Sequence, residues 1–87
     1  MNQSVIFTDT TDWAAGLASV HFTAQQQGMN INCYISLTSL SELSGQVIEK
    51  PASALVVFEQ YRFDIEDKAE ALIEIEAFDE QGRIFIR

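Results

Sequence analysis

Basic side chains, cysteine and proline are all scarce in this chain of 87 residues. Only 5 Lys or Arg stand against 13 Asp or Glu, which leaves a formal net charge of -8 at pH 7. Proteins that bind nucleic acid need cations to neutralise phosphates, so this balance argues against direct binding of DNA or RNA. The negative charge is also repelled by anionic membrane surfaces, and no apolar run reaches the roughly 18 residues that a membrane span requires.

Cysteine and histidine each occur once, as Cys33 and His21. A single cysteine excludes an internal disulfide and suits a reducing compartment, while a zinc site needs about four Cys or His ligands. All four glycines are isolated, so the chain has no glycine-rich loop for phosphate. The start, Met1 to Ser4, has neither the basic residues nor the apolar segment of a signal peptide. We therefore expect a cytoplasmic protein without a metal or other cofactor.

The composition itself is that of a folded protein. Hydrophobic residues make up 47% and charged residues 21%, which are ordinary values for a globular chain. A length of 87 residues suffices for one modest core and not for two. We expect residues 1–87 to form a single domain.

The strongest local pattern is a β-hairpin. Residues alternate between apolar and polar from Leu17 to Gln26 and from Met29 to Leu37, with Gln27-Gly28 between them as a two-residue turn. Pairing Gln26 with Met29 brings apolar residues together on one face: Ala24 with Ile31, Phe22 with Cys33, and Val20 with Ile35. The other face then pairs His21 with Tyr34 and Thr23 with Asn32. A slip of one residue would disrupt both faces, so the register is well specified.

A short strand is predicted before this hairpin. Ser4 to Thr8 is β-branched and aromatic, and the polar residues Asp9 to Asp12 that follow predict a turn. Trp13 comes next, and we expect its ring to cover one end of the core.

Two helices are predicted after the hairpin. Ser39 and Glu42 match a capping box, which predicts the start of a short helix that Gly45 ends. Pro51 suits the first turn of a second helix, which runs to about Ile75. Its apolar stripe recurs at helical spacing and consists of Leu55, Phe58, Ile65, Ala69 and Leu72.

The end of the long helix has two interpretations. Either the helix continues to about Ala77 and breaks between Asp79 and Gly82, or a strand begins near Ile73 and pairs with Arg83–Arg87 in a hairpin. In the hairpin register a three-residue loop would turn Ile84 and Ile86 to the wrong side, so we favour the longer helix. Both interpretations make Arg83–Arg87 a closing strand.

These elements predict an α+β fold of two layers. We expect a small antiparallel sheet, made of the three strands and the closing strand, with the long helix packed on one face. The helix stripe would cover the face that carries Phe22 and Cys33.

The same residues resemble the short bacterial proteins of domain-of-unknown-function family fourteen-eighty-eight. The shared positions are Ile6, Phe7, Trp13, Val20, His21, Phe22, Gly28, Met29, Cys33, Tyr34, Ile35, Ser36, Leu40, Phe58, Arg62, Ile65, Glu66, Ala69, Gln81 and Gly82. The resemblance covers nearly the whole chain, and most of these positions are packing residues. It implies a small cytoplasmic bacterial protein of unassigned activity, with no catalytic residue to carry over.

Two sets of residues are candidates for a site. His21, Tyr34, Asn32 and Thr23 would form a recognition surface on the uncovered face of the hairpin, although such a face is also ordinary for a half-covered sheet. Arg62 lies between Phe58 and Ile65 on the helix, and its guanidinium would either bind an anion or pair with a carboxylate such as Asp9 or Asp12.

Other residues favour structural roles. Glu66, Glu70 and Glu74 form a helical ladder of carboxylates that is more typical of a solvated face than of a cation site. Cys33 is predicted to be a buried apolar residue on the face opposite His21. The two residues therefore cannot act together as a thiol nucleophile and its general base.

The sequence thus leaves two hypotheses about function. The first is a non-catalytic module that binds another protein, or a second copy of itself, through a sheet edge or the polar hairpin face. The second is a small-ligand binder or weak enzyme with a pocket at the end of the sheet, near Trp13 and Arg62.

Overall fold

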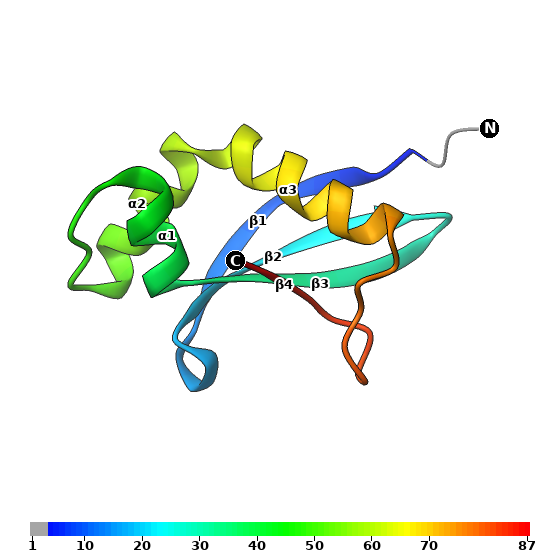
Figure 1. Cartoon of the computed structure of the whole chain (residues 1–87), viewed down its shortest axis with the longest axis horizontal. Helices are drawn as coiled ribbons and strands as arrows, with labels where there is room; N and C mark the ends of the chain where they lie inside the picture. Colours follow the sequence, from blue (N-terminus) through cyan, green and yellow to red (C-terminus); the bar gives the residue numbers. More distant parts are fainter. Residues whose placement is uncertain (1–3) are drawn as a thin grey trace.

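A computed structural model describes residues 4–87 of the chain. The elements in order are β1 (Ile6–Ala14), the 3-10 turn η1 (Ala15–Leu17), β2 (Ser19–Gln26), β3 (Met29–Ser36), α1 (Leu37–Ser44), α2 (Pro51–Gln60), α3 (Arg62–Glu74) and β4 (Ile84–Ile86). The strands form one sheet in the order β1-β2-β3-β4, and α2 and α3 lie along one side of it (Figure 1). The predicted α+β fold is confirmed. No helix within residues 4–87 is both long and apolar enough to cross a membrane.

The β2–β3 hairpin has the predicted register at every position. Phe22 pairs with Cys33 on the covered face, and His21 pairs with Tyr34 on the opposite face. Gln27 and Gly28 both have positive φ, at 54° and 79°, as a tight hairpin turn requires. From Val20 to Ala24 and from Ile31 to Ile35, every second residue therefore faces the helices and is buried. These residues are Val20, Phe22, Ala24, Ile31, Cys33 and Ile35.

The first strand is longer than predicted. β1 runs from Ile6 through Ala14, so the polar residues from Asp9 to Asp12 lie within the strand and do not form a turn. Four steps along β1, from Phe7 to Thr11, match two steps along β2, so β1 has an irregular bulge with two extra residues there. β1 is an edge strand, and polar residues are tolerated there because one side of the strand faces solvent. Trp13 is part of this strand, half-buried and packed against the core.

The prediction of a purely antiparallel sheet was wrong. β1, β2 and β3 are antiparallel, but β4 pairs parallel with β3, with Tyr34 opposite Phe85. The three helices connect β3 to β4, and this crossover carries the chain back to the end of the sheet where β3 begins. The sheet is therefore mixed.

The short helix begins earlier than the capping box predicted. Ser36, the last residue of β3, is the N-cap of α1, and its Oγ accepts a 3.0 Å hydrogen bond from the Ser39 N–H. Ser39 therefore lies in the first turn of α1 and is not the N-cap. The capping box had predicted a helix start three residues later than the observed one. Gly45 ends α1 in the left-handed region, at φ 71°, as predicted.

The predicted long helix is two helices with a break at Tyr61. Tyr61 has φ −116° and ψ 20°, and its N–H donates to both Val57 and Phe58 carbonyls. Its hydroxyl donates to the Ser44 carbonyl at 3.4 Å, which ties the break to the end of α1. The change of direction also alters the buried stripe: Ile73 is fully buried in α3, while Leu55 and Leu72 lie half-buried at its margin.

The helix interpretation of residues 73–74 is confirmed, although α3 ends at Glu74 and not near Ala77. The Glu76 N–H donates to the Ile73 carbonyl, and the Ala77 N–H donates to the Leu72 carbonyl at 2.9 Å. This pair of bonds is the Schellman motif, which usually has glycine in its left-handed position. Here that position is Glu76, at φ 58°.

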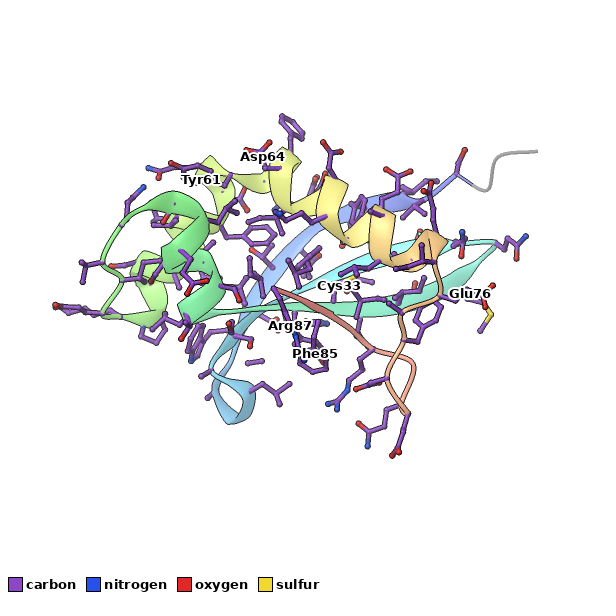
Figure 2. All side chains as sticks on the ribbon, in the orientation of Figure 1. Cys33, Tyr61, Asp64, Glu76, Phe85 and Arg87 are labelled. Carbon is purple, nitrogen blue, oxygen red and sulfur yellow. The ribbon has the colours of Figure 1, made fainter. Side chains whose placement is uncertain are left out.

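The core forms where α2 meets the hairpin. Phe58 is 0% exposed, and its ring centroid lies 5.0 Å from that of Phe22. Ile65 and Ala69 continue this contact along α3, and Ile84 adds β4 to it. Figure 2 shows Cys33 between the sheet and the helices.

We expect Phe58→Ala to remove most of the stability of the fold. Truncating a buried phenylalanine costs about 3–5 kcal/mol, which approaches the total free energy of unfolding of a small domain. Urea denaturation followed by circular dichroism measures the loss. Phe63→Ala is the control, because Phe63 is 78% exposed and its truncation is expected to change the free energy by less than about 0.5 kcal/mol. Equal effects of the two substitutions would contradict this account of the core.

We expect Glu76→Gly to stabilise the protein by about 0.5–1 kcal/mol, because glycine adopts the left-handed conformation without the steric cost of a Cβ atom. Glu80→Gly is the matched control: it removes the same charge from an exposed residue whose φ is not positive. Urea denaturation of both variants separates the backbone effect from the charge effect. A loss of stability in Glu76→Gly would show that its conformation carries no strain.

Candidate functional site

The face of the sheet away from the helices carries the candidate recognition surface. The hairpin register places His21 beside Tyr34 and Thr23 beside Asn32, so all four predicted residues share this face. The neighbouring strands extend it, because Asp12 of β1 pairs with His21 and Phe85 of β4 pairs with Tyr34. We call these six residues the exposed sheet face. Figure 2 shows the Phe85 ring on the side of β4 opposite the helices.

Three rings form a row across the exposed sheet face. The centroids of His21 and Tyr34 are 5.1 Å apart, and those of Tyr34 and Phe85 are also 5.1 Å apart, the latter pair stacked at 19°. The Arg83 guanidinium lies over the last two rings, 5.0 Å from the centroid of Phe85 and 6.0 Å from that of Tyr34. Each such ring contact is worth about 0.5–1.5 kcal/mol beyond its buried area, so these contacts favour the observed arrangement of the side chains.

Hydrogen bonds hold the histidine end of this row. His21 Nδ1 lies 2.8 Å from Asp12 Oδ1, and Nε2 lies 2.8 Å from Asn32 Oδ1. Both ring nitrogens therefore have protein partners, and the imidazole is fixed in orientation. Asp12 remains 66% exposed at the side chain, while His21 is 24% exposed, so the pair is accessible from solvent.

A compact turn holds the arginine end. Asp79 Oδ1 accepts hydrogen bonds from the N–H groups of Gln81 and Arg83, at 2.9 Å and 2.8 Å, and Oδ2 accepts one from Arg83 Nε at 2.8 Å. These bonds, above all the one from the Arg83 backbone N–H, lower the pKa of Asp79. The ionised carboxylate thus orients the side chain of Arg83 over the ring of Phe85.

Arg62 lies on the other side of the molecule, at the break between α2 and α3. Its guanidinium donates to the Glu59 and Glu66 carboxylates and to the backbone carbonyls of Thr8 and Asp9. Arg62 thus pairs with carboxylates, as one of its two predicted roles required, but its partners are Glu59 and Glu66, within one helical turn, and not Asp9 or Asp12. Hydrogen bonding to Glu59 and then to Glu66 raises the pKa of Arg62, and the bond from Arg62 lowers the pKa of Glu59.

The arginine joins two parts of the fold. All five of its N–H donors are used, two of them on carbonyls of the β1 bulge. It also packs 5.1 Å from the centroid of the Phe58 ring. The guanidinium therefore fastens the helix break to the edge strand.

Cys33 lies on the opposite side of the sheet from His21 and is 0% exposed. Burial raises the pKa of its thiol to about 12, so the thiolate is scarce at neutral pH. Within residues 4–87, no group of three or more His, Cys, Asp or Glu side chains is arranged to hold a metal ion.

Comparisons with known proteins place the chain in a family. A family model described as "Protein of unknown function (DUF1488)" matches residues 5–86. The chain is 36% identical over 87 residues to the uncharacterized protein YrdB of Escherichia coli (strain K12), and 34% identical to the uncharacterized protein YrdB of Shigella flexneri, with 99% of each chain covered in both cases. A crystal structure of a protein of unknown function from Shewanella loihica PV-4, from the same family, is 55% identical and superposes with a TM-score of 0.94 over 99% of this chain and 94% of the other. The resemblance seen in the sequence is thus confirmed, and the chain belongs to the DUF1488 family of proteins of unknown function.

Proposed function

We propose that this protein is a small, non-catalytic module of the cytoplasm that binds another protein through the exposed sheet face. The observation that carries the proposal is the row of contacting side chains, His21, Tyr34, Phe85 and Arg83, on the face of the sheet away from α2 and α3 (Figure 1). Tyrosine, phenylalanine and arginine are enriched in protein interfaces, because they offer large contact areas at a low cost in side-chain entropy. The ring contacts lower that cost further, because the side chains are already ordered.

The charge of the chain indicates the kind of partner. A net charge of -8 attracts a protein with a basic surface, and the exposed Asp12 carboxylate puts part of that charge on the binding face itself. We therefore propose a basic protein whose contact area carries an apolar or aromatic centre.

The hydrogen bonds at His21 support a binding role over a catalytic one. Both ring nitrogens have protein partners at 2.8 Å, so neither is presented to a substrate as a general base. The single cysteine is buried on the other side of the sheet, which leaves the histidine without a thiol nucleophile.

The second candidate, a ligand pocket near Trp13 and Arg62, has less support. Arg62 uses all five of its N–H donors within the protein, so a ligand anion would have to displace carboxylates already in contact. Trp13 packs against the core as part of β1. We propose that Arg62 has a structural role.

The structural role of Arg62 is tested by Arg62→Lys. Lysine keeps the charge but has one nitrogen and cannot reach both glutamates and both carbonyls, so we expect a loss of about 1–3 kcal/mol in the free energy of unfolding. Arg87→Lys is the control, since Arg87 is exposed and its replacement is expected to be neutral. If Arg62→Lys is as stable as the wild type, the five-donor arrangement contributes nothing to the fold.

The binding role is tested by a double variant, Tyr34→Ala with Phe85→Ala, which removes the centre of the ring row and leaves the covered face intact. We expect the immobilised wild-type chain to capture a basic protein from a lysate of its own organism, and the double variant to bind the purified partner at least about tenfold more weakly. Affinity should also fall as salt is raised.

Phe63→Ala is the matched control for this experiment, because it removes an exposed ring from the helical side of the molecule. Thermal denaturation establishes that both variants are folded. Equal capture by the wild type and the double variant would reject the exposed sheet face as the binding surface.

A further inference from the structure

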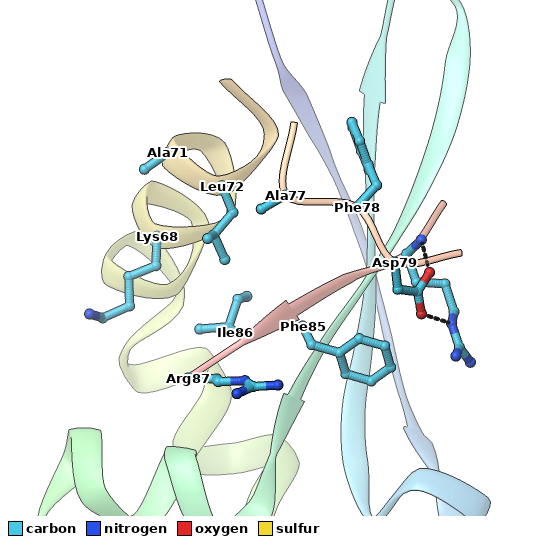
Figure 3. Close-up of a pocket in the computed structure, with 10 residues that line it drawn as sticks. Lys68, Ala71, Leu72, Ala77, Phe78, Asp79, Phe85, Ile86 and Arg87 are labelled. Atoms are coloured by element: carbon cyan, nitrogen blue, oxygen red, sulfur yellow. Dashed lines mark hydrogen bonds and ion pairs between the residues drawn. The ribbon is translucent and has the colours of Figure 1, made fainter. Parts of the chain in front are cut away.

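A groove lies between the second half of α3 and β4, on the helical side of the closing strand (Figure 3). Its volume is about 570 Å³, which lies within the range of small-molecule sites, about 300–1,000 Å³. The residues that line it include Lys68, Ala71, Leu72, Phe78, Ile86 and Arg87. Phe85 of the exposed sheet face and Arg83 beside it also line the groove, so the groove adjoins that face across β4.

The groove is hollow because small side chains stand where α3 passes over β4. Ala71 and Ala77 leave the space, Leu72 and the buried Ile86 form an apolar floor, and Phe78 forms a wall. The Schellman motif at the end of α3 sets the position of Ala77, and the Asp79 turn then directs the chain into β4. Backbone hydrogen bonds thus fix the position of the loop that forms one side of the groove.

Basic residues concentrate around this groove. Lys68, Arg83 and Arg87 all line it, which is three of the five basic residues in a chain of net charge -8. Arg83 pairs with Asp79, whereas neither Lys68 nor Arg87 forms an ion pair with any residue that the structure describes. Figure 3 shows Lys68 on α3 and Arg87 after β4, with their charged groups pointing in different directions, and Phe78 and Asp79 on the opposite side of the groove. The groove therefore has two cations without an ion-pair partner on one side, and Phe78 beside the Arg83–Asp79 ion pair on the other.

We infer that this groove binds a small monocarboxylic acid with an apolar chain or ring. The carboxylate would lie at the end formed by Lys68 and Arg87, because charge-assisted hydrogen bonds to a carboxylate are the strong contacts that these cations lack. The apolar body would lie on Leu72, Phe78 and Ile86. The inference goes beyond protein binding through the exposed sheet face and does not depend on it.

The shape of the groove favours a small molecule over an extended peptide. β4 has only three residues, so a peptide strand added at its free edge would gain few backbone hydrogen bonds. The turn at Asp79 also ends the groove on one side.

Octanoate is the probe that tests the inference, by titration into the ¹⁵N-labelled full chain with amide shifts as the readout. We expect saturable shifts confined to residues 68–72, 77–79 and 83–87, with a Kd of about 1 mM or tighter. 1-Octanol keeps the chain and lacks the charge, so it should bind at least about fivefold more weakly. No saturation up to about 20 mM, shifts elsewhere, or equal affinity for the alcohol would overturn the inference.

Variants test the two ends separately. Lys68→Gln with Arg87→Gln should weaken octanoate binding about tenfold, whereas Lys50→Gln, which removes a cation outside the groove, should leave it unchanged. Ala71→Leu should fill the cavity and abolish binding, and the dispersion of its amide spectrum shows whether the fold is retained. Unchanged binding in a folded Ala71→Leu variant, or equal weakening by Lys50→Gln, would place the ligand outside the groove.

Discussion

The contact between Phe22 and Phe58 joins the two layers of this protein. Phe22 reaches the covered side of the sheet because the β2–β3 register places every second residue there, and Phe58 meets it because α2 begins at Pro51 with its apolar face toward the hairpin. The elements around this contact depend on it. Arg62 packs on the outer side of Phe58 while it holds the β1 bulge, and Ile65 and Ala69 carry the same interface to β4. Without this pair, the two layers would lose the aromatic contact at the centre of their interface.

The parts of the fold that were predictable from the sequence are those set by neighbouring residues. The hairpin was predictable at the level of single pairs, because the turn at Gln27-Gly28 and the alternation on both sides agree. The break at Tyr61 was not, since it lacks Gly or Pro and arises from contacts with Ser44 and β1. The end of α3 was obscured for a similar reason: Glu76 occupies a position where glycine is the usual signal. The direction of β4 depends on the path of three helices, which no local pattern specifies.

On the exposed sheet face, too, some residues were predictable from the local pattern and others were not. Thr23, His21, Asn32 and Tyr34 were grouped by the hairpin register alone. Asp12 was missed because the bulge in β1 shifts its register, and Arg83 and Phe85 were missed because their place depends on the parallel pairing of β4. One signal did exist: within Arg83–Arg87, Phe85 alternates with two isoleucines and had to face the other way. The groove beside α3 had no sequence signal, because its residues come from a helix, a loop and a strand that meet only in the folded chain.

The parallel pairing of β4 with β3 has a consequence for synthesis. Ile84 and Ile86 fill the core beside Cys33 and Ile35, yet about fifty residues separate the two strands, and these pairs are slow to form because a long loop must close first. A nascent chain that has left the ribosome only as far as α2 therefore has an open sheet edge at β3, with aliphatic side chains exposed beside it. Until β4 arrives, that edge has no partner strand, and an unpaired edge of this kind favours association with other strands.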